Sequence, residues 1–334
     1  MAAIWRCEIF TTMTQQLTRI EPFSVADLSE IGSGLNRPEC VLAAPDGSVY
    51  SGDWTLGIAK IASDGTTGPA VEADLIAQGF RPNGIALMPE GDFLITNMGR
   101  AGGVWRVSPR GDVTPFATEV AGRPIPPTNF VLVDGGRTWI TISSTERKHN
   151  HFTSAANTGQ ILLVQDGQVS VAADGLNWTN EVRVSAGGEY LFVNETFACR
   201  TTRYDIAPDG TLGSPVQLTF PQDTYPDGMA FDAEGGLWIA CVISNRLIRV
   251  AHDLTWTILL EDPDPALTDI AASYAKGGLT WDQISQSRGS RLSNLSSIAF
   301  GGPDLKTVHL GGLGHNRVHV LRSPVPGAPM SQWQ

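Results

Sequence analysis

The stretch that decides the fold is YPDGMAFDAEGGLWIA, residues 225–240. Its two apolar runs, 229–231 and 237–240, are too short for helices and are rich in strand-forming residues. Between them lies Asp-Ala-Glu-Gly, a compact turn in which the glycine supplies a positive φ. Asp227 stands just before the first run, between Pro226 and Gly228. The stretch therefore predicts two strands joined by a tight turn, with an acidic side chain where the first strand starts.

Comparable units recur along the chain, each with a polar residue, a short apolar run, a glycine-containing turn and a second apolar run. The polar residues that open the units are Glu39, Asn83, Asn129, Asn180, Asp227 and Ser296 or Ser297. Successive gaps between them are 44, 46, 51 and 47 residues, and then about 69. A repeat of about 40 to 50 residues is typical of one four-stranded propeller blade.

This repeat predicts an all-β fold, a six-bladed β-propeller with four-stranded blades around a central channel. We expect a single domain over residues 1–334, because a radial arrangement buries the faces of the sheets and protects their short edges. A β-helix is the alternative, although its rungs would be shorter than these units. Residues 20–35 are expected to close the ring by pairing with the last blade. An insertion near residues 262–292, where the repeat disappears, is expected to cap one face.

Composition narrows the range of partners and compartments. The net charge of −11 argues against a nucleic-acid footprint and against binding to an anionic membrane surface. No apolar run is long enough to span a bilayer, and the first residues do not resemble a signal peptide. The four cysteines form no CxxC pair, which favours a reducing compartment. We therefore expect a cytoplasmic protein that acts on a small molecule, with no signal for a particular oligomeric state.

The opening polar residues have a common place in a propeller. The innermost strand of each blade runs along the channel, so the starts of these strands form a ring around one opening. The ring would bring together Glu39, Asn129, Asn180 and Asp227, whose carboxylate and amide oxygens suit a hard divalent cation. Ca²⁺ is the first choice, with Mg²⁺, Mn²⁺ or Zn²⁺ as alternatives, although the ring has no His or Cys. Any one of these residues alone is better explained as a turn cap, but four at equivalent positions favour a metal site.

Two motifs resemble a known family. The run PDGMAFDAEGGLWIAC, residues 226–241, and the run AFGGPDLKTV, residues 299–308, resemble the SMP-30/gluconolactonase/LRE-like family of regucalcin and sugar-lactonase-like propellers. The resemblance covers roughly residues 36–325. It implies a six-bladed propeller whose divalent cation is held by Glu39, Asn129, Asn180 and Asp227. One departure is Pro127, which stands where some family members have an arginine that helps to hold sugar substrates.

The resemblance implies hydrolysis of a lactone by a metal-dependent hydrolase. The cation would act as a Lewis acid and activate water, with Asp227 as ligand and general base and Glu39 chiefly as a ligand. Substrate contacts are expected from Asn83, Asn129, Trp54, Trp178 and His151. Together with Phe130, the two tryptophans suggest a more apolar substrate than a sugar lactone.

Two other functions are compatible with the sequence. The first is a metal-dependent isomerase, lyase or phosphotriesterase acting on a cyclic substrate in the same site. The second is a non-catalytic propeller that binds a partner protein, which the metal ring disfavours. The sequence has no Gly-x-Ser-x-Gly elbow, no HExxH helix and no phosphate loop, so a serine hydrolase or an NTP-dependent enzyme has no support.

Overall fold

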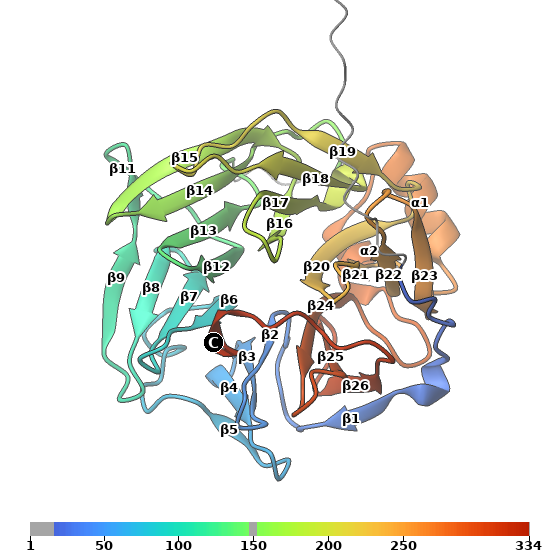
Figure 1. Cartoon of the computed structure of the whole chain (residues 1–334), viewed down its shortest axis with the longest axis horizontal. Helices are drawn as coiled ribbons and strands as arrows, with labels where there is room; N and C mark the ends of the chain where they lie inside the picture. Colours follow the sequence, from blue (N-terminus) through green and yellow to red (C-terminus); the bar gives the residue numbers. More distant parts are fainter. Residues whose placement is uncertain (1–16, 147–151, 334) are drawn as a thin grey trace, which may run out of the picture.

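The computed structural model describes residues 17–146 and 152–333. Six four-stranded antiparallel sheets stand around a central axis like the blades of a propeller (Figure 1). In this part of the chain only two α-helices accompany them. The predicted all-β, six-bladed β-propeller is therefore confirmed.

Blades 1 to 5 each use four consecutive strands, ordered from the channel outward. Blade 1 comprises β2 (Val41–Ala43), β3 (Val49–Asp53), β4 (Gly57–Ile61) and β5 (Thr67–Pro69). Blade 2 comprises β6 (Pro82–Leu87), β7 (Phe93–Asn97), β8 (Val104–Val107) and β9 (Val113–Ala117), and a small hairpin of β10 (Glu119–Val120) and β11 (Arg123–Pro124) follows it. Blade 3 comprises β12 (Phe130–Asp134), β13 (Arg137–Ile142), β14 (Gly159–Gln165) and β15 (Gln168–Leu176). Blade 4 comprises β16 (Thr179–Val184), β17 (Tyr190–Glu195), β18 (Arg200–Asp205) and β19 (Val216–Thr219). Blade 5 comprises β20 (Tyr225–Phe231), β21 (Leu237–Val242), β22 (Arg246–Val250) and β23 (Trp256–Glu261).

Blade 6 joins the two ends of the described chain. Its three inner strands are β24 (Leu295–Gly301), β25 (Thr307–Gly312) and β26 (Val318–Arg322). The fourth and outermost strand is β1 (Ser29–Ile31), which pairs antiparallel with β26, so that Ser29 faces Val320. An N-terminal strand from within residues 20–35 thus completes the blade formed by the end of the chain.

Four of the six innermost strands share an irregularity at the end where they start. Their pairing register shifts between Pro82 and Ile85 in β6, Thr179 and Val182 in β16, Pro226 and Met229 in β20, and Leu295 and Ser297 in β24. Asp227 therefore lies inside β20, on a bulge, and the prediction that it precedes its strand is wrong. The reason is that a bulge interrupts pairing and re-aims a side chain without ending the strand. We call the channel end at these bulges the mouth.

Gly228 follows Asp227 because two blades meet there. A Cβ atom at this position would lie 2.4 Å from the carbonyl oxygen of Ser296 and 2.7 Å from Cα of Ser297. Gly84 has the same role between blades 2 and 3, where a Cβ would lie 2.7 Å from Cα of Phe130. Both glycines are required by close approach of neighbouring innermost strands and not by a turn.

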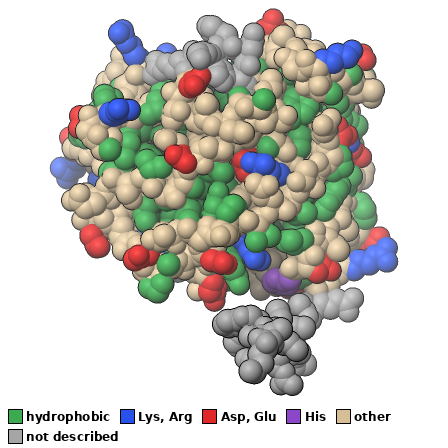
Figure 2. Space-filling view, turned by 90° about the horizontal axis from the view of Figure 1, so that it is seen from above, with side chains coloured by type: hydrophobic (Ala, Val, Ile, Leu, Met, Phe, Trp, Pro, Cys, Tyr) green, Lys and Arg blue, Asp and Glu red, His purple; other side chains and the backbone are tan. Residues whose placement is uncertain are grey.

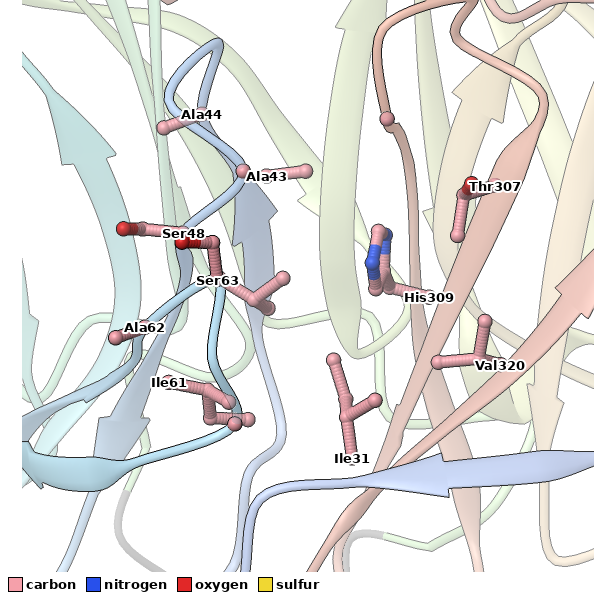
Figure 3. A pocket seen from close by; sticks show the side chains of 14 residues that line it. Ile31, Ala43, Ala44, Ser48, Ile61, Ala62, Ser63, Thr307, His309 and Val320 are labelled. Carbon is pink, nitrogen blue, oxygen red and sulfur yellow. The ribbon is translucent and has the colours of Figure 1, made fainter.

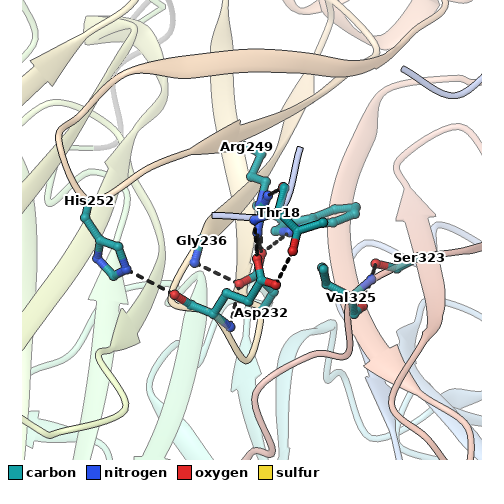
Figure 4. A network of polar contacts seen from close by, with 9 residues as sticks. Thr18, Asp232, Gly236, Arg249, His252, Ser323 and Val325 are labelled. Carbon is teal, nitrogen blue, oxygen red and sulfur yellow. Dashed lines mark hydrogen bonds and ion pairs between the residues drawn. The ribbon is translucent and has the colours of Figure 1, made fainter. Parts of the chain in front are cut away.

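The turn between β20 and β21 is built around Asp232, whose side chain is buried (Figure 4). Its carboxylate accepts hydrogen bonds from the Gly236 amide at 2.8 Å and from the Trp238 indole at 2.8 Å. Arg249 forms an ion pair with the same carboxylate at 2.7 Å and donates to the carbonyl oxygen of Thr18. The blade 5 turn is therefore also the anchor of the N-terminal segment.

The C-terminal strap, residues 324–333, crosses the channel end opposite the mouth. The Ala328 amide donates to the Phe231 carbonyl at 2.9 Å, and the Trp333 indole donates to the Ala43 carbonyl at 3.0 Å. Phe231 and Ala43 are the last residues of β20 and β2, and in Figure 1 the red C-terminal trace passes over the inner strands of blades 6 and 1. Met330 of the strap packs against the hydrophobic core. One end of the channel is thus covered by the chain itself.

Two helices flank the mouth within residues 262–292. They are α1 (Leu267–Ala275) and α2 (Trp281–Gln286). The Tyr274 hydroxyl donates to the carbonyl oxygen of Phe197, and the Ser287 hydroxyl donates to that of Ile243 at 2.7 Å. Phe197 and Ile243 follow the mouth ends of β17 and β21, which places the insertion beside the mouth.

The outside of the disc carries charges of both signs. On the side shown in Figure 2, Lys and Arg side chains are interspersed with Asp and Glu and with apolar surface. This face gathers no basic patch. No helix in the described ranges has the length and apolar character required to cross a bilayer.

Candidate active site

Asn83 joins two other predicted mouth residues, Glu39 and Asn129. Its side-chain amide donates to Glu39 Oε1 at 3.1 Å and to the main-chain oxygen of Asn129 at 3.0 Å. All three residues are buried. Asn83 therefore ties blade 1 to blade 3 across the mouth and orients the Glu39 carboxylate.

Arg37 is part of this cluster, although the sequence did not single it out. Its guanidinium forms an ion pair with Glu39 Oε2, and its Nη1 donates to Asn83 Oδ1 at 2.7 Å. The same group lies 4.3 Å from the centroid of the Trp54 ring, whose indole N–H donates to the Pro82 carbonyl at 3.1 Å. Trp54, a predicted substrate contact, thus supports a guanidinium on one face of its ring.

Asp227 approaches the cluster from blade 5 and is 3% exposed. Burial raises the pKa of its carboxyl group well above the ordinary value, and the nearby carboxylates of Glu39 and Glu181 raise it further. The Arg37 guanidinium lowers this pKa and only partly offsets the increase. The buried carboxyl groups of blades 1 and 5 thus repel one another, and Arg37 offsets this repulsion only in part.

Asn180 presents an unpaired oxygen. Its side-chain N–H donates to Thr196 Oγ1 at 3.2 Å, and the Thr196 hydroxyl in turn donates to the Pro226 carbonyl at 2.8 Å. This relay fixes which end of the Asn180 amide carries the oxygen. Asn180 Oδ1 is buried and has no hydrogen-bond partner among the described residues, an arrangement that is costly unless a ligand is present.

The donor set fits a hard divalent cation. Glu39 and Asp227 supply two carboxylates that share the positive charge of Arg37, and Asn180 supplies an amide oxygen without a partner. Within residues 17–146 and 152–333, no three side chains drawn from His, Cys, Asp and Glu are grouped so that they could hold a metal ion. A cation at the mouth would therefore require the amide oxygens in addition to the two carboxylates.

Deeper in the channel lies a third acidic residue, Glu181. It forms an ion pair with Arg183 at 2.9 Å and accepts a hydrogen bond from the Met229 amide at 3.3 Å. Burial raises the pKa of Glu181 to about 7, because the loss of solvation outweighs the neighbouring guanidinium. Spacing in the sequence does not distinguish Glu181, since this residue directly follows Asn180. Only the fold places it beneath the mouth.

The aromatic residues near the mouth fall into two groups. Phe130 lies under the Arg183 guanidinium at 4.7 Å, as Trp54 lies under Arg37. Trp178 lies apart, edge-on to Phe152 and Phe197 with ring centroids 5.3 Å away in each case. Trp54 and Phe130 thus each contact a guanidinium group with one ring face and do not form an apolar surface. His151, also a predicted substrate contact, lies outside the described residues.

A separate cavity of about 220 Å³ lies between blades 1 and 6, at the strap end of β2 (Figure 3). Ile31, Ala43, Ile61 and Val320 line it together with His309. Burial lowers the pKa of His309 to about 4, so this imidazole is neutral near pH 7. The cavity contains none of the mouth residues, and it is not the site defined by the ring.

Comparisons with known proteins identify the family of this chain. The sequence profile of the SMP-30/gluconolactonase/LRE-like region matches residues 65–263, more than half of the chain. The chain therefore belongs to this family, as the two sequence motifs predicted.

The individual relatives share limited sequence identity with this chain. Regucalcin of Danio rerio is 32% identical over 79 residues, which are 23% of this chain and 25% of that relative's length. A gluconolactonase from Xanthomonas campestris has a TM-score of 0.62 at 15% identity, with 89% of each chain covered. The calcium-binding protein regucalcin from Agrobacterium tumefaciens has a TM-score of 0.63 at 15% identity, covering 91% of this chain and 98% of the other. At these identities the structural likeness establishes the fold.

Proposed function

We propose that this protein is a divalent-metal-dependent hydrolase that opens a lactone, with the propeller as its single domain and the cytoplasm as its location. Membership of a family that includes gluconolactonase-like propellers supports the reaction class. The observation that carries the proposal is the buried, unpartnered oxygen of Asn180 at the mouth, where the carboxyl groups of Glu39 and Asp227 share one guanidinium. An isomerase, lyase or phosphotriesterase on a cyclic substrate would use the same groups, but no contact in the mouth favours one of them.

Glu39, Asn129, Asn180 and Asp227 would hold the cation, with Ca²⁺ as the first choice. When bound, such a cation polarises an ester carbonyl and lowers the pKa of water. Asn83 orients Glu39 by its hydrogen bond at 3.1 Å, and Thr196 orients Asn180. These contacts hold the ligand oxygens in place before any ligand arrives, which reduces the cost of organising the site.

Asp227 is the proposed general base. Its raised pKa means that the buried carboxylate binds a proton more readily than an exposed one, which is the property required of a base near neutral pH. Asn83, Asn129, Trp54 and Trp178 remain the proposed substrate contacts, together with His151.

The test is the metal content of the purified protein, followed by a panel of lactones assayed with and without chelator. We expect bound Ca²⁺ and a hydrolytic activity that chelator abolishes and Ca²⁺ restores. Asp227→Asn is expected to lower kcat/KM by about a hundredfold or more. Asp253→Asn, on an exposed turn of the same blade, is the control and should behave like the unmodified protein. A metal-free protein whose activity ignores chelator would refute the proposal, and full activity in Asp227→Asn would refute the role of the base.

A further inference from the structure

Arg37 is a guanidinium built into the mouth. Its side chain is only 13% exposed and is held on three sides by Glu39, Asn83 and the Trp54 ring. The contacts with Glu39 and Asn83 both use Nη1. Among the described residues, Nε and Nη2 have no hydrogen-bond partner, so one edge of the guanidinium retains two parallel donors.

The backbone at Arg37 is unusual as well. Its φ is 61°, in the left-handed region that a residue with a Cβ atom adopts only at a cost. Such conformations persist where the surrounding structure enforces them, and they cluster at ligand sites. Here the Asp53 carboxylate accepts a hydrogen bond from the Asn36 amide at 2.6 Å, and the Trp54 amide donates to the Asn36 carbonyl at 3.1 Å. The loop before Arg37 is therefore clamped to the end of β3.

Arg81 provides an internal comparison. It occupies the equivalent place in blade 2, since Arg-Pro precedes both Glu39 and Asn83. Its Nη1 donates to the carbonyl oxygens of Phe80 at 2.7 Å and Ile76 at 3.4 Å. Arg81 thus completes its own loop, whereas Arg37 contacts the side chains of the mouth. The difference is a property of the fold and is not visible in the repeat.

Charge at the site points to the kind of ligand. The carboxyl groups of Glu39, Glu181 and Asp227 face the guanidinium groups of Arg37 and Arg183. With all three carboxyl groups ionised, three negative and two positive charges give −1, and a bound divalent cation would change this sum to +1. The chain as a whole carries −11. A local positive excess therefore complements an anionic group that the rest of the surface would repel.

The geometry of the guanidinium narrows the class of anion. Two parallel N–H donors in one plane match the two oxygens of a carboxylate, a pairing that is shorter and stronger than a neutral hydrogen bond. We propose that Arg37 is a specificity-determining residue that binds a carboxylate of the substrate, so that the substrate is a lactone bearing a carboxylate group. This inference rests on the proposed lactonase function. Arg37 supplies this guanidinium from blade 1, whereas the side chain of Pro127, before blade 3, has no hydrogen-bond donor.

The first experiment measures binding without turnover. The probes are 3-oxocyclopentane-1-carboxylate, a ring ketone that cannot be hydrolysed, and its carboxamide, titrated calorimetrically into the Ca²⁺-loaded protein. We expect the carboxylate to bind about tenfold or more tightly than the carboxamide. Arg37→Gln should remove this preference, and Arg37→Lys should retain only part of it because lysine cannot form the paired contact. Arg81→Gln is the matched control and should keep the full preference.

Three results would each overturn the inference. The unmodified protein could show no preference for the carboxylate, it could bind neither probe, or the preference could persist in Arg37→Gln. If Arg37→Gln fails to fold, the comparison of Arg37→Lys with the unmodified protein still decides, because an unchanged preference in Arg37→Lys contradicts a paired contact. The protein could prefer the carboxylate through Arg37 and yet hydrolyse no lactone. This result would support carboxylate recognition and refute the proposed function, so failure of the inference and failure of the proposed function are distinguishable.

A second experiment uses two true lactones, 5-oxotetrahydrofuran-2-carboxylate and its carboxamide. Arg37→Gln is expected to raise KM about tenfold or more for the carboxylate only. An equal loss of kcat on both lactones would mean that Arg37 acts at the reacting carbonyl, and this result would also overturn the inference.

Discussion

At the scale of single residues, Asn180 is the clearest sign of a ligand. Its side-chain nitrogen donates a hydrogen bond to Thr196 Oγ1, whose own hydrogen is used by the Pro226 carbonyl. A flip of the amide group would therefore break the bond to Thr196 without giving the oxygen a donor. An unpaired buried oxygen destabilises a protein by about 1–3 kcal/mol, and this cost is removed if a cation takes the position. The residue therefore links the stability of the fold to the binding of a metal.

This link leads to a prediction for Asn180→Leu, which replaces the amide by an apolar group of similar shape. Without metal, we expect the free energy of unfolding to change by no more than about 1 kcal/mol, because the lost hydrogen bond is offset by removal of the unpaired oxygen. The rise in Tm on adding Ca²⁺ should be lost. Thermal unfolding with and without Ca²⁺ measures both quantities, and a Ca²⁺-dependent rise that equals that of the unmodified protein would exclude Asn180 as a ligand.

At the scale of elements, each blade is stabilised by its own turn as well as by its neighbours. Asp232 is the strongest case, because one carboxylate holds the β20–β21 turn, the Trp238 indole and the Arg249 guanidinium. Removing one partner of a buried ion pair leaves the other charge unpaired. The cost therefore exceeds that of an ordinary surface contact.

Asp232→Ala is expected to lower the free energy of unfolding by about 3–5 kcal/mol. The substitution removes the carboxylate, so the Arg249 guanidinium and the Trp238 indole remain buried without the acceptor that both of them use. Chemical denaturation measures the change. Asp253→Ala removes an exposed turn carboxylate that caps the Thr255 amide at 3.0 Å, and it should cost far less. Equal effects of the two substitutions would contradict the central role of Asp232.

Blade 6 is expected to confer sensitivity to acid. His309 in β25 has a pKa lowered by burial from 6.5 to about 4, so the unfolded chain binds a proton between these values while the folded protein does not. His309 therefore favours folding above pH 6.5, and this contribution is lost as the pH falls toward 4. Glu181, whose pKa is raised to about 7, changes stability in the opposite sense.

The measurement is therefore a difference between two proteins. We expect the free energy of unfolding of the unmodified protein, relative to that of His309→Leu, to decrease as the pH falls from 6.5 to about 4. Denaturation curves at several pH values give this difference directly, with other titrating groups cancelling. A difference independent of pH would show that His309 is protonated equally well in the folded protein.

At the scale of the whole molecule, the two ends of the channel differ in structure. The mouth carries the polar ring and is flanked by α1 and α2, while the strap covers the other end. Cys40 lies under the strap, because it lines a small cavity together with Met330 and Gln332. Burial raises the pKa of the Cys40 thiol strongly, which leaves it unreactive as long as the cover is in place.

A chain that ends at Ala328 should expose this thiol. We expect Cys40 to react faster with a disulfide reagent in the shortened chain than in the full chain, since the cover over its cavity is gone. The shortened chain carrying Cys40→Ser is the control, because it reports the reaction of the remaining cysteines. Equal labelling rates with and without residues 329–334 would mean that the strap does not restrict access from this end.

The sequence alone predicted the architecture, which the structure confirms, and it named a candidate ligand set that stays a prediction. Blades are local units of about 40 to 50 residues, so their turns and apolar runs are written in consecutive residues and repeat visibly. The opening polar residues of the repeats follow from the same register. Resemblance in two motifs was sufficient to identify the family that the profile match over residues 65–263 confirmed.

Only the tertiary structure decided what surrounds those residues. Arg37 and Arg81 have the same neighbours in sequence, yet one contacts Glu39 and the other contacts the carbonyl of Phe80. The bulge at Asp227, the depth of Glu181 and the strap across the channel likewise depend on contacts between distant blades. The physical reason is that a repeat specifies each blade separately, whereas the direction and charge environment of a side chain at the axis depend on all six blades together.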